Sequence, residues 1–208
     1  MKIYLMSMSS DELNRAVNGY FTDIPEEVSE RINNAKSVSR KKEILGGYIL
    51  LDKALKSNKM SIENEQIKYE KKGKPYIDKI QFNISHSADF IALVFGKNQC
   101  GIDIMNVTHF KENICEKYFT VKETDIVKNS SKPDEIFTLN WCLKEAYFKM
   151  TGEGITRATK EVDFSELLTL KVPFEKEIYG TYFYCDKIKE NYVCVCLKEK
   201  ENIEVKYE

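Results

Sequence analysis

The sequence lacks the long apolar runs of membrane proteins, because no stretch approaches about 18 consecutive apolar residues. It also lacks a basic leader, since Met1–Met8 opens directly with an apolar, strand-like run. Neither sign of charge is in excess, because 32 basic and 33 acidic residues leave a net charge of −1. We therefore expect a cytoplasmic protein that binds neither membrane nor nucleic acid, and any anion site must be local.

The cysteines lack the spacing of a structural zinc site. No CxxC pair occurs among the six, and only two histidines accompany them. Cys194 and Cys196 lie two residues apart in a strand-like run, so they share one sheet face as small buried hydrophobes. We expect reduced cysteines in a reducing compartment.

The length of 208 residues suits one compact body or two small halves that share a core. Hydrophobic residues at 42% can fill an interior, and charged residues at 31% suit a well-solvated surface. The composition therefore excludes disordered and fibrous classes.

Apolar periodicity and turn residues predict the elements of the first half. These are a strand at Ile3–Met6, a helix at Asp11–Phe21 capped by Ser9 or Ser10, a helical region from Glu26 to about Lys56 with a break near Ser37, and extended pieces at Ile67–Tyr69 and Phe90–Phe95. A long polar connection separates the two extended pieces and is predicted to be functional, with Lys72–Pro75 and Asn83–Ser87 as its turn-forming parts.

The second half repeats this order of elements. Its predicted elements are a strand at Gly101–Met105, a helix begun by the capping box Thr120–Glu123, a helix at Glu135–Thr151 stopped by Gly152 and Gly154, and strands at Tyr179–Cys185 and Tyr192–Lys198. The order strand, helices, strand, strand thus occurs twice, which indicates two related halves.

Three polar residues of the second half could share a site. Ile102 and Ile104 face one way from their strand, so Asp103 projects from the other face. Glu145 and Lys149 lie four residues apart on one helix stripe, where a solvated ion pair would contribute about 0.2 to 0.5 kcal/mol. Magnesium often takes only one or two protein carboxylates, so Asp103 with Glu145 would suffice. A turn cap at Asp103 and a surface role for Glu145 are the alternatives.

Five ordered segments resemble the phosphopantetheinyl transferase family, in its larger, two-half surfactin-type branch. In chain order these segments are Gly73–Pro75, Phe82–Ser87, Gly101–Ile104, Phe119–Glu123 and Trp141–Lys149. The resemblance covers most of residues 40–154.

The resemblance implies an α+β fold of two similar halves related by a pseudo-twofold axis. Each half would be a small antiparallel sheet packed with helices. Residues 1–99 would contact the coenzyme A nucleotide, residues 100–208 would carry the metal-binding and catalytic groups, and coenzyme A would lie between the halves. The implied protein is a monomer.

The implied activity is that of a 4′-phosphopantetheinyl transferase, or holo-[acyl-carrier-protein] synthase. With Mg²⁺ as cofactor, such an enzyme moves the phosphopantetheine arm of coenzyme A to a serine of an apo acyl or peptidyl carrier protein and releases 3′,5′-ADP. The partners would be carrier proteins of fatty acid, polyketide or nonribosomal peptide biosynthesis. The region Lys111–Asn129 is the implied docking surface.

The motif matches assign roles in the second half. Asp103 and Glu145 match the metal-binding acids, and Glu145 also matches the general base that takes the serine proton. Lys149 matches the lysine that steadies the phosphoryl charge.

The matches in the first half concern the nucleotide. Contacts with coenzyme A are implied for Lys74, Ser85 and His86, although a locally hydrogen-bonded loop histidine is the alternative for His86. A group of basic residues could hold the 3′-phosphate or form a solvated helix face, and it comprises Arg31, Lys36, Arg40 and Lys42.

Met105 departs from the family pattern, because members of this branch commonly have a third acid at this position. A thioether is a soft ligand and does not hold magnesium, so a water would replace the missing carboxylate. We expect weakened magnesium affinity with activity retained. The alternative is a noncatalytic relative that binds coenzyme A or a carrier protein.

Overall fold

The computed structural model describes residues 1–20, 24–61, 67–69, 75–78 and 80–208. These residues form two compact units. Unit 1 comprises Met1–Lys97 with Ile203–Glu208, and unit 2 comprises Asn98–Asn202. Among the described helices, none is long and apolar enough to cross a membrane.

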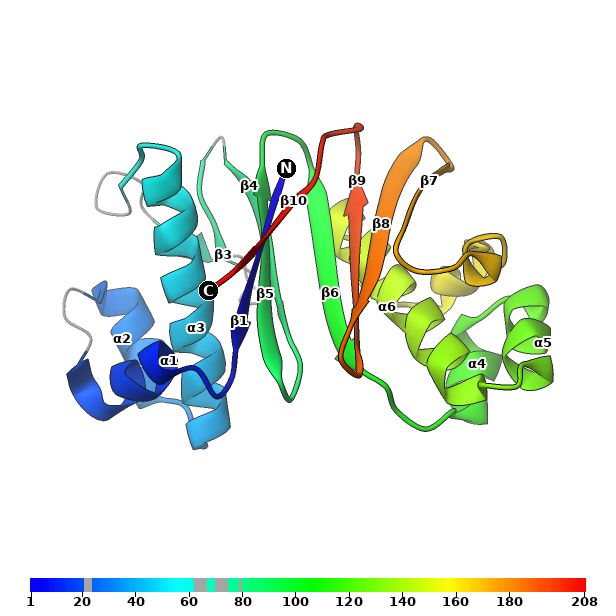
Figure 1. Ribbon diagram of the computed structural model, residues 1–208, viewed down its shortest axis with the longest axis horizontal. Helices are drawn as coiled ribbons and strands as arrows, with labels where there is room; N and C mark the ends of the chain where they lie inside the picture. Colours follow the sequence, from blue (N-terminus) through cyan, green and yellow to red (C-terminus); the bar gives the residue numbers. More distant parts are fainter. Residues whose placement is uncertain (21–23, 62–66, 70–74, 79) are drawn as a thin grey trace. The chain divides into compact units, whose positions relative to one another are not determined.

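Unit 1 is built on a four-stranded sheet in the order β10-β1-β5-β4 (Figure 1). Its strands are β1 (Lys2–Ser7), β4 (Gln81–His86), β5 (Phe90–Gly96) and β10 (Glu204–Tyr207). β5 runs antiparallel to both β1 and β4, whereas β10 runs parallel to β1. A separate two-stranded ladder joins β2 (Lys68–Tyr69) to β3 (Pro75–Tyr76).

Serine side chains cap two of the helices described in unit 1, and a third begins after Pro25 without a side-chain cap. The helices are α1 (Asp11–Arg15), which continues into a turn at Ala16–Tyr20 kinked at Gly19, α2 (Glu26–Asn33) and α3 (Val38–Ser57). The Ser10 hydroxyl accepts the Leu13 amide, and the Ser37 hydroxyl accepts the Arg40 amide at 3.1 Å. The cap at Ser37 separates α2 from α3, as the sequence predicted.

Unit 2 is built on a fully antiparallel sheet in the order β6-β9-β8-β7. Its strands are β6 (Cys100–Asn106), β7 (Phe174–Ile178), β8 (Thr181–Ile188) and β9 (Asn191–Leu197). Its helices are α4 (Glu112–Tyr118), α5 (Val121–Asn129) and α6 (Pro133–Thr151), followed by 3-10 turns at Arg157–Glu161 and Leu167–Thr169. The α6 side chains Leu143, Ala146 and Met150 pack into one core with Phe183 and Cys194 of the sheet.

The α+β class is confirmed, and so are most of the elements expected from the sequence. The capping box at Thr120 is present at the start of α5, and Gly152 ends α6 in the left-handed conformation with φ 80°. The predicted strands near the chain start and at Gly101–Met105 appear as β1 and β6.

Three expectations were wrong. The segment Asn83–Ser87 was predicted as a polar connection, but Gln81–His86 is strand β4, because Phe82 is buried and pairs with β5. The unit 1 sheet is not wholly antiparallel, because β10 adds to it in parallel. Cys194 is not a free thiol, since its register places it directly opposite Cys185, with which it forms a disulfide.

The division of the chain also differs from the expected halves at 1–99 and 100–208. The last strand lies with unit 1, because β10 pairs with β1. Four short elements, namely α4, β3, β7 and β10, carried no pattern from which they were predicted.

Candidate functional site

Helix α6 approaches strand β6 unusually closely at Gly101. A Cβ atom at this position would lie 2.1 Å from the backbone oxygen of Ala146 and 2.5 Å from the backbone nitrogen of Met150. Both neighbours are backbone atoms and cannot rotate away, so only glycine fits here. Because residues two apart in a strand share a face, the same approach turns Asp103 toward α6.

An acidic pair and a lysine meet where α6 covers β6. The Nζ atom of Lys149 donates to the Oδ1 atom of Asp103 at 2.7 Å, and the Asp103 side chain is only 11% exposed. Burial raises the pKa of Glu145, the negative charge of Asp103 raises it further, and Lys149 partly offsets both effects. The three residues therefore form one electrostatic cluster, and the Lys149 ammonium pairs with Asp103 in it.

The donor set of this cluster fits a hard divalent cation. Asp103 raises the pKa of the partly buried Glu145, so a cation between the two carboxylates would favour the charged form of Glu145, and magnesium accepts such a small protein contribution. Among the residues the structure describes, no group of three or more His, Cys, Asp or Glu side chains is arranged to hold a metal. Met105 is not a third donor for magnesium, because a thioether is a soft ligand, and its side chain packs partly against the unit 2 core.

Lys144, next to Glu145 in the chain, has a structural environment that the sequence did not reveal. Its side chain and that of Glu123 are both fully buried, and their charged atoms lie 3.0 Å apart. The ammonium also donates to the backbone oxygens of Thr159 and Val162, at 3.2 and 2.6 Å. Burial lowers the pKa of Lys144, while Glu123 acts in the opposite direction.

Glu123 serves three backbone and side-chain partners at once. Besides Lys144, it accepts the amide of Thr120 in the capping box and the amide of Phe164 at 2.7 Å. The pair thereby joins α5, α6 and the segment after α6. The capping-box spacing in the sequence predicted the contact with the Thr120 amide. No local pattern could predict the contacts with Lys144 and with the Phe164 amide.

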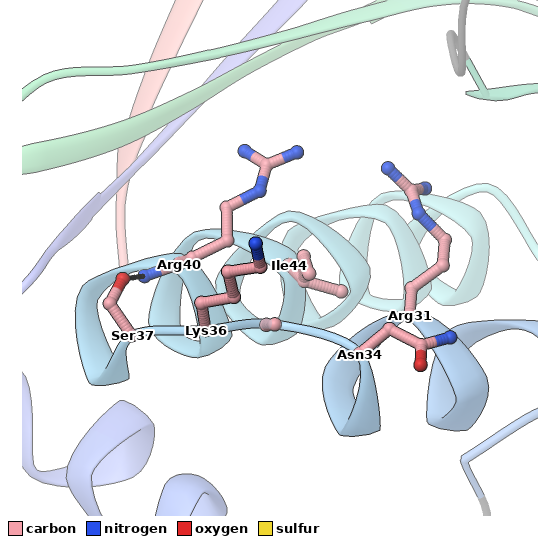
Figure 2. A pocket seen from close by; sticks show the side chains of 7 residues that line it. Arg31, Asn34, Lys36, Ser37, Arg40 and Ile44 are labelled. Atoms are coloured by element: carbon pink, nitrogen blue, oxygen red, sulfur yellow. Dashed lines mark hydrogen bonds between the residues drawn. The ribbon is translucent and has the colours of Figure 1, made fainter.

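In unit 1, a basic cavity of about 450 Å³ lies where α2 ends and α3 begins. Figure 2 shows the Arg31 and Arg40 guanidinium groups extending on the same side, with Lys36 between them on the connecting segment. The start of α3 itself carries Arg40 and Lys41, where the positive end of the helix dipole disfavours cations. An anion bound here would relieve this repulsion.

The other predicted nucleotide residues are placed differently. Lys42 points away from the cavity residues to α1, because its Nζ atom donates to the Asn14 side chain at 2.7 Å and to the Met8 oxygen at 3.0 Å. Ser85 is buried on β4. His86 ends β4, and its Nε2 atom lies 3.5 Å from Nη1 of Arg40. Lys74 lies outside the described residues, so its role stays a prediction.

Comparisons with known proteins agree on one family. Residues 99–197 match the family model described as the 4′-phosphopantetheinyl transferase superfamily. The chain is 34% identical over 166 residues to the 4′-phosphopantetheinyl transferase HetI of Nostoc sp., covering 73% of this chain and 62% of that protein. It is 27% identical over 199 residues to the 4′-phosphopantetheinyl transferase gsp of Aneurinibacillus migulanus, covering 85% and 83%.

Two more similar proteins are a sequence relative and a solved structure. The 4′-phosphopantetheinyl transferase Sfp of Bacillus subtilis is 25% identical over 166 residues, covering 75% of this chain and 72% of that protein. Among solved structures, the holo-[acyl-carrier-protein] synthase of Thermotoga maritima aligns with a TM-score of 0.34 and 19% identity, covering 50% of this chain and 64% of that chain. The chain thus spans less than two thirds of the HetI relative and of this solved chain.

Proposed function

We propose that this chain, whose residues 99–197 match the family model of the 4′-phosphopantetheinyl transferase superfamily, transfers the phosphopantetheine arm of coenzyme A to a serine of an apo carrier protein. The observation that carries this proposal is the cluster of Asp103, Glu145 and Lys149. These residues have the chemical types that phosphoryl transfer requires, and each stands at the matching position of the family motifs.

In the proposed reaction, the serine oxygen forms a bond to the phosphorus that bears the pantetheine arm. The bond from that phosphorus to the departing oxygen breaks, and 3′,5′-ADP leaves with its electron pair. Glu145 accepts the serine proton, and the Lys149 ammonium neutralises charge on the phosphoryl oxygens. Most of the acceleration comes from positioning and charge neutralisation.

Asp103 and Glu145 would hold Mg²⁺. An ion held there would supply Lewis-acid stabilisation to the pyrophosphate oxygens. In the absence of a third acid at Met105, the remaining coordination positions would be filled by water and phosphate oxygens.

We propose that the nucleotide end of coenzyme A is held in unit 1. The cavity lined by Arg31, Lys36 and Arg40, with His86 beside Arg40, supports this assignment. Lys42 is a weaker candidate than the other basic residues, because its ammonium already donates to the Asn14 side chain of α1 and to the backbone oxygen of Met8. Ser85 and Lys74 keep their proposed nucleotide roles from the motif match.

The finer architecture is also a proposal. Each unit contains a four-stranded sheet and one long helix, α3 in unit 1 and α6 in unit 2, which supports two halves of common design. We propose the pseudo-twofold relation, a monomeric cytoplasmic enzyme, and a carrier-protein surface within 111–129. The placement within 111–129 rests on the motif resemblance.

The direct test is intact-protein mass spectrometry of a purified apo carrier protein incubated with coenzyme A, magnesium and this protein. We expect a gain of one phosphopantetheine, abolished by Glu145→Ala. The matched control is Glu135→Ala on the same helix, whose carboxylate pairs with Lys132 and Lys187. No gain with acyl or peptidyl carriers, despite coenzyme A binding, would favour the noncatalytic binding protein, for which Met105 is the supporting observation.

A further inference from the structure

A carboxylate lies among the basic groups proposed to hold the nucleotide. The Oε2 atom of Glu43, in the second turn of α3, lies 2.7 Å from Nη1 of Arg40 and 3.4 Å from Nε2 of His86. One oxygen atom therefore contacts side chains from α3 and from β4. The other carboxylate oxygen lies 3.5 Å from the Ser39 hydroxyl, which holds the carboxylate from its own helix.

The exposures of these side chains form a gradient. Glu43 is 16% exposed, whereas Arg40 and His86 are 47% and 43% exposed. The acid is thus the inner member, and the two basic side chains stand above it toward solvent. A half-exposed arginine without an anchor would sample many rotamers, and binding an anion would have to fix it.

Glu43 has two opposing effects on an anion at this place. Its negative charge repels the anion, but this effect is screened at a half-exposed site. Its charge-assisted hydrogen bond fixes the planar guanidinium of Arg40, and the contact with Nε2 limits the rotation of the His86 ring. Since Arg40 also lines the cavity with Arg31 and Lys36, the anchor orders one wall of it.

We propose that Glu43 is a positioning residue that pre-orders Arg40 and His86 for the nucleotide phosphate of coenzyme A. This inference rests on the proposed function, because that function supplies the ligand of the cavity. Glu43 does not touch the ligand and acts through Arg40 and His86. The orientation effect outweighs the repulsion, so an acid strengthens binding of an anion.

The proposal predicts that removing the negative charge of Glu43 weakens coenzyme A binding, whereas simple repulsion predicts that it strengthens binding. Calorimetric titration with coenzyme A and with dephospho-coenzyme A compares wild type, Glu43→Ala and Glu43→Gln. We expect Glu43→Ala to weaken coenzyme A binding about tenfold, the scale of a lost charge-assisted contact, and to leave dephospho-coenzyme A nearly unchanged. Glu43→Gln, which keeps an acceptor oxygen, should fall between. In the transfer assay, KM for coenzyme A should rise while kcat is retained.

The matched control is Asp52→Asn on the same helix. Asp52 is 13% exposed and paired with Lys56 at 2.6 Å, so the substitution removes the same charge from a similar depth. We expect it to change coenzyme A affinity less than twofold. If only the negative charge of the acid affected the bound anion, and not its contacts, replacing Glu43 and replacing Asp52 would change coenzyme A affinity in the same direction.

Unchanged or tighter coenzyme A binding by a folded Glu43→Ala protein would overturn the positioning role while the wild type still transferred. Failure of the wild type to bind coenzyme A at all would overturn the proposed function, and the two failures are therefore distinguishable. The side-chain ¹H–¹⁵N resonance of Arg40 Nε gives a ligand-free readout. A shift of that resonance toward the value of a freely rotating arginine in Glu43→Ala would support the role of Glu43 in fixing Arg40. An unchanged chemical shift and line width would contradict it.

Discussion

At the scale of single residues, two lysines of helix α6 have opposite environments. Lys149 is partly exposed and pairs with Asp103 in the proposed catalytic cluster. Lys144 is fully buried against Glu123. A charged residue in a helical pattern is ordinarily predicted to lie in solvent, so only the tertiary structure reveals that Lys144 belongs to the interior.

Breaking the buried pair should be costly, because one charge would be left without a partner. We expect Glu123→Gln to destabilise unit 2 by about 3 kcal/mol, and Lys144→Met by a similar amount. The double variant should be less destabilised than the sum of the two, since neither charge is then left alone. Urea unfolding followed by the fluorescence of Trp141, which packs on Tyr118 and Phe119, measures all three.

Additive losses in the double variant would contradict this coupling. Lys128→Met is the matched control, because Lys128 forms an exposed ion pair with Glu112. A surface pair of this kind contributes at most about 1 kcal/mol, so its loss should be small.

Asp134 gives a prediction about acid stability. Its carboxylate accepts the Phe110 amide at 2.9 Å and contacts His109 Nδ1 at 2.9 Å, and the Phe110 amide is the main cause of its lowered pKa. A lowered folded-state pKa means that the stabilisation is present above the unfolded pKa and is lost as pH falls through the folded value. Wild type should therefore exceed Asp134→Asn in Tm near neutral pH.

Thermal melts of both proteins across the acid range would check this. The gap in Tm should narrow as pH falls below the ordinary range of an aspartate. A gap that stayed constant down to strong acid would show that the titration of Asp134 is not its cause.

At the scale of elements, the close packing of α6 on β6 depends on the absence of a side chain at Gly101. We expect Gly101→Ala to push α6 from β6, separate Asp103 from Lys149, and lower kcat by at least about tenfold, since small misplacements of catalytic groups have large effects. Urea unfolding should show a stability loss of about 1 to 3 kcal/mol from overpacking.

Gly47→Ala provides the comparison for that substitution. A Cβ atom at Gly47 of α3 would meet Ile84 Cγ2 at 3.4 Å, at the edge of ordinary contact. Since alanine favours helices by about 1 kcal/mol over glycine, this variant should be neutral or slightly stabilised. Equal losses in both variants would remove the argument for a special approach at Gly101.

The elements with local signals were predictable, and those defined by tertiary pairing were not. Capping residues at Ser10, Ser37 and Thr120 marked helix starts that the structure contains. β4 was missed because Asn83, Ser85 and His86 are turn-forming or polar types, and pairing with β5 overrides those preferences.

The same division holds for the candidate site. The order of the motifs along the chain predicts that Asp103, Glu145 and Lys149 share a site, and in the fold Asp103 does lie beside Lys149. The basic residues of unit 1 are only a loose set in the sequence. The turn between α2 and α3 is what brings Arg31 and Arg40 to one cavity, while Lys42 binds at α1.

At the scale of the whole molecule, the end of the described chain completes the sheet of unit 1. β10 pairs with β1 over Lys2–Leu5, and Glu208 contacts Lys53 of α3 at 2.9 Å. We expect deletion of residues 203–208 to expose the β1 edge and speed hydrogen exchange in β1, while β6 and β9 keep their protection. Exchange measured by mass spectrometry checks this, and equal loss in both sheets would contradict it.

The pairing of β10 with β1 has a consequence for folding during synthesis. Residues 98–202 leave the ribosome before residues 203–208, so unit 2 has all of its strands while unit 1 still lacks its parallel edge strand. Parallel pairing between segments this far apart in the chain carries a high loop-closure entropy and is expected to form late. The nascent chain would therefore expose the open edge of β1 until residues 203–208 emerge, and a chaperone that binds unpaired strand edges would act during that interval.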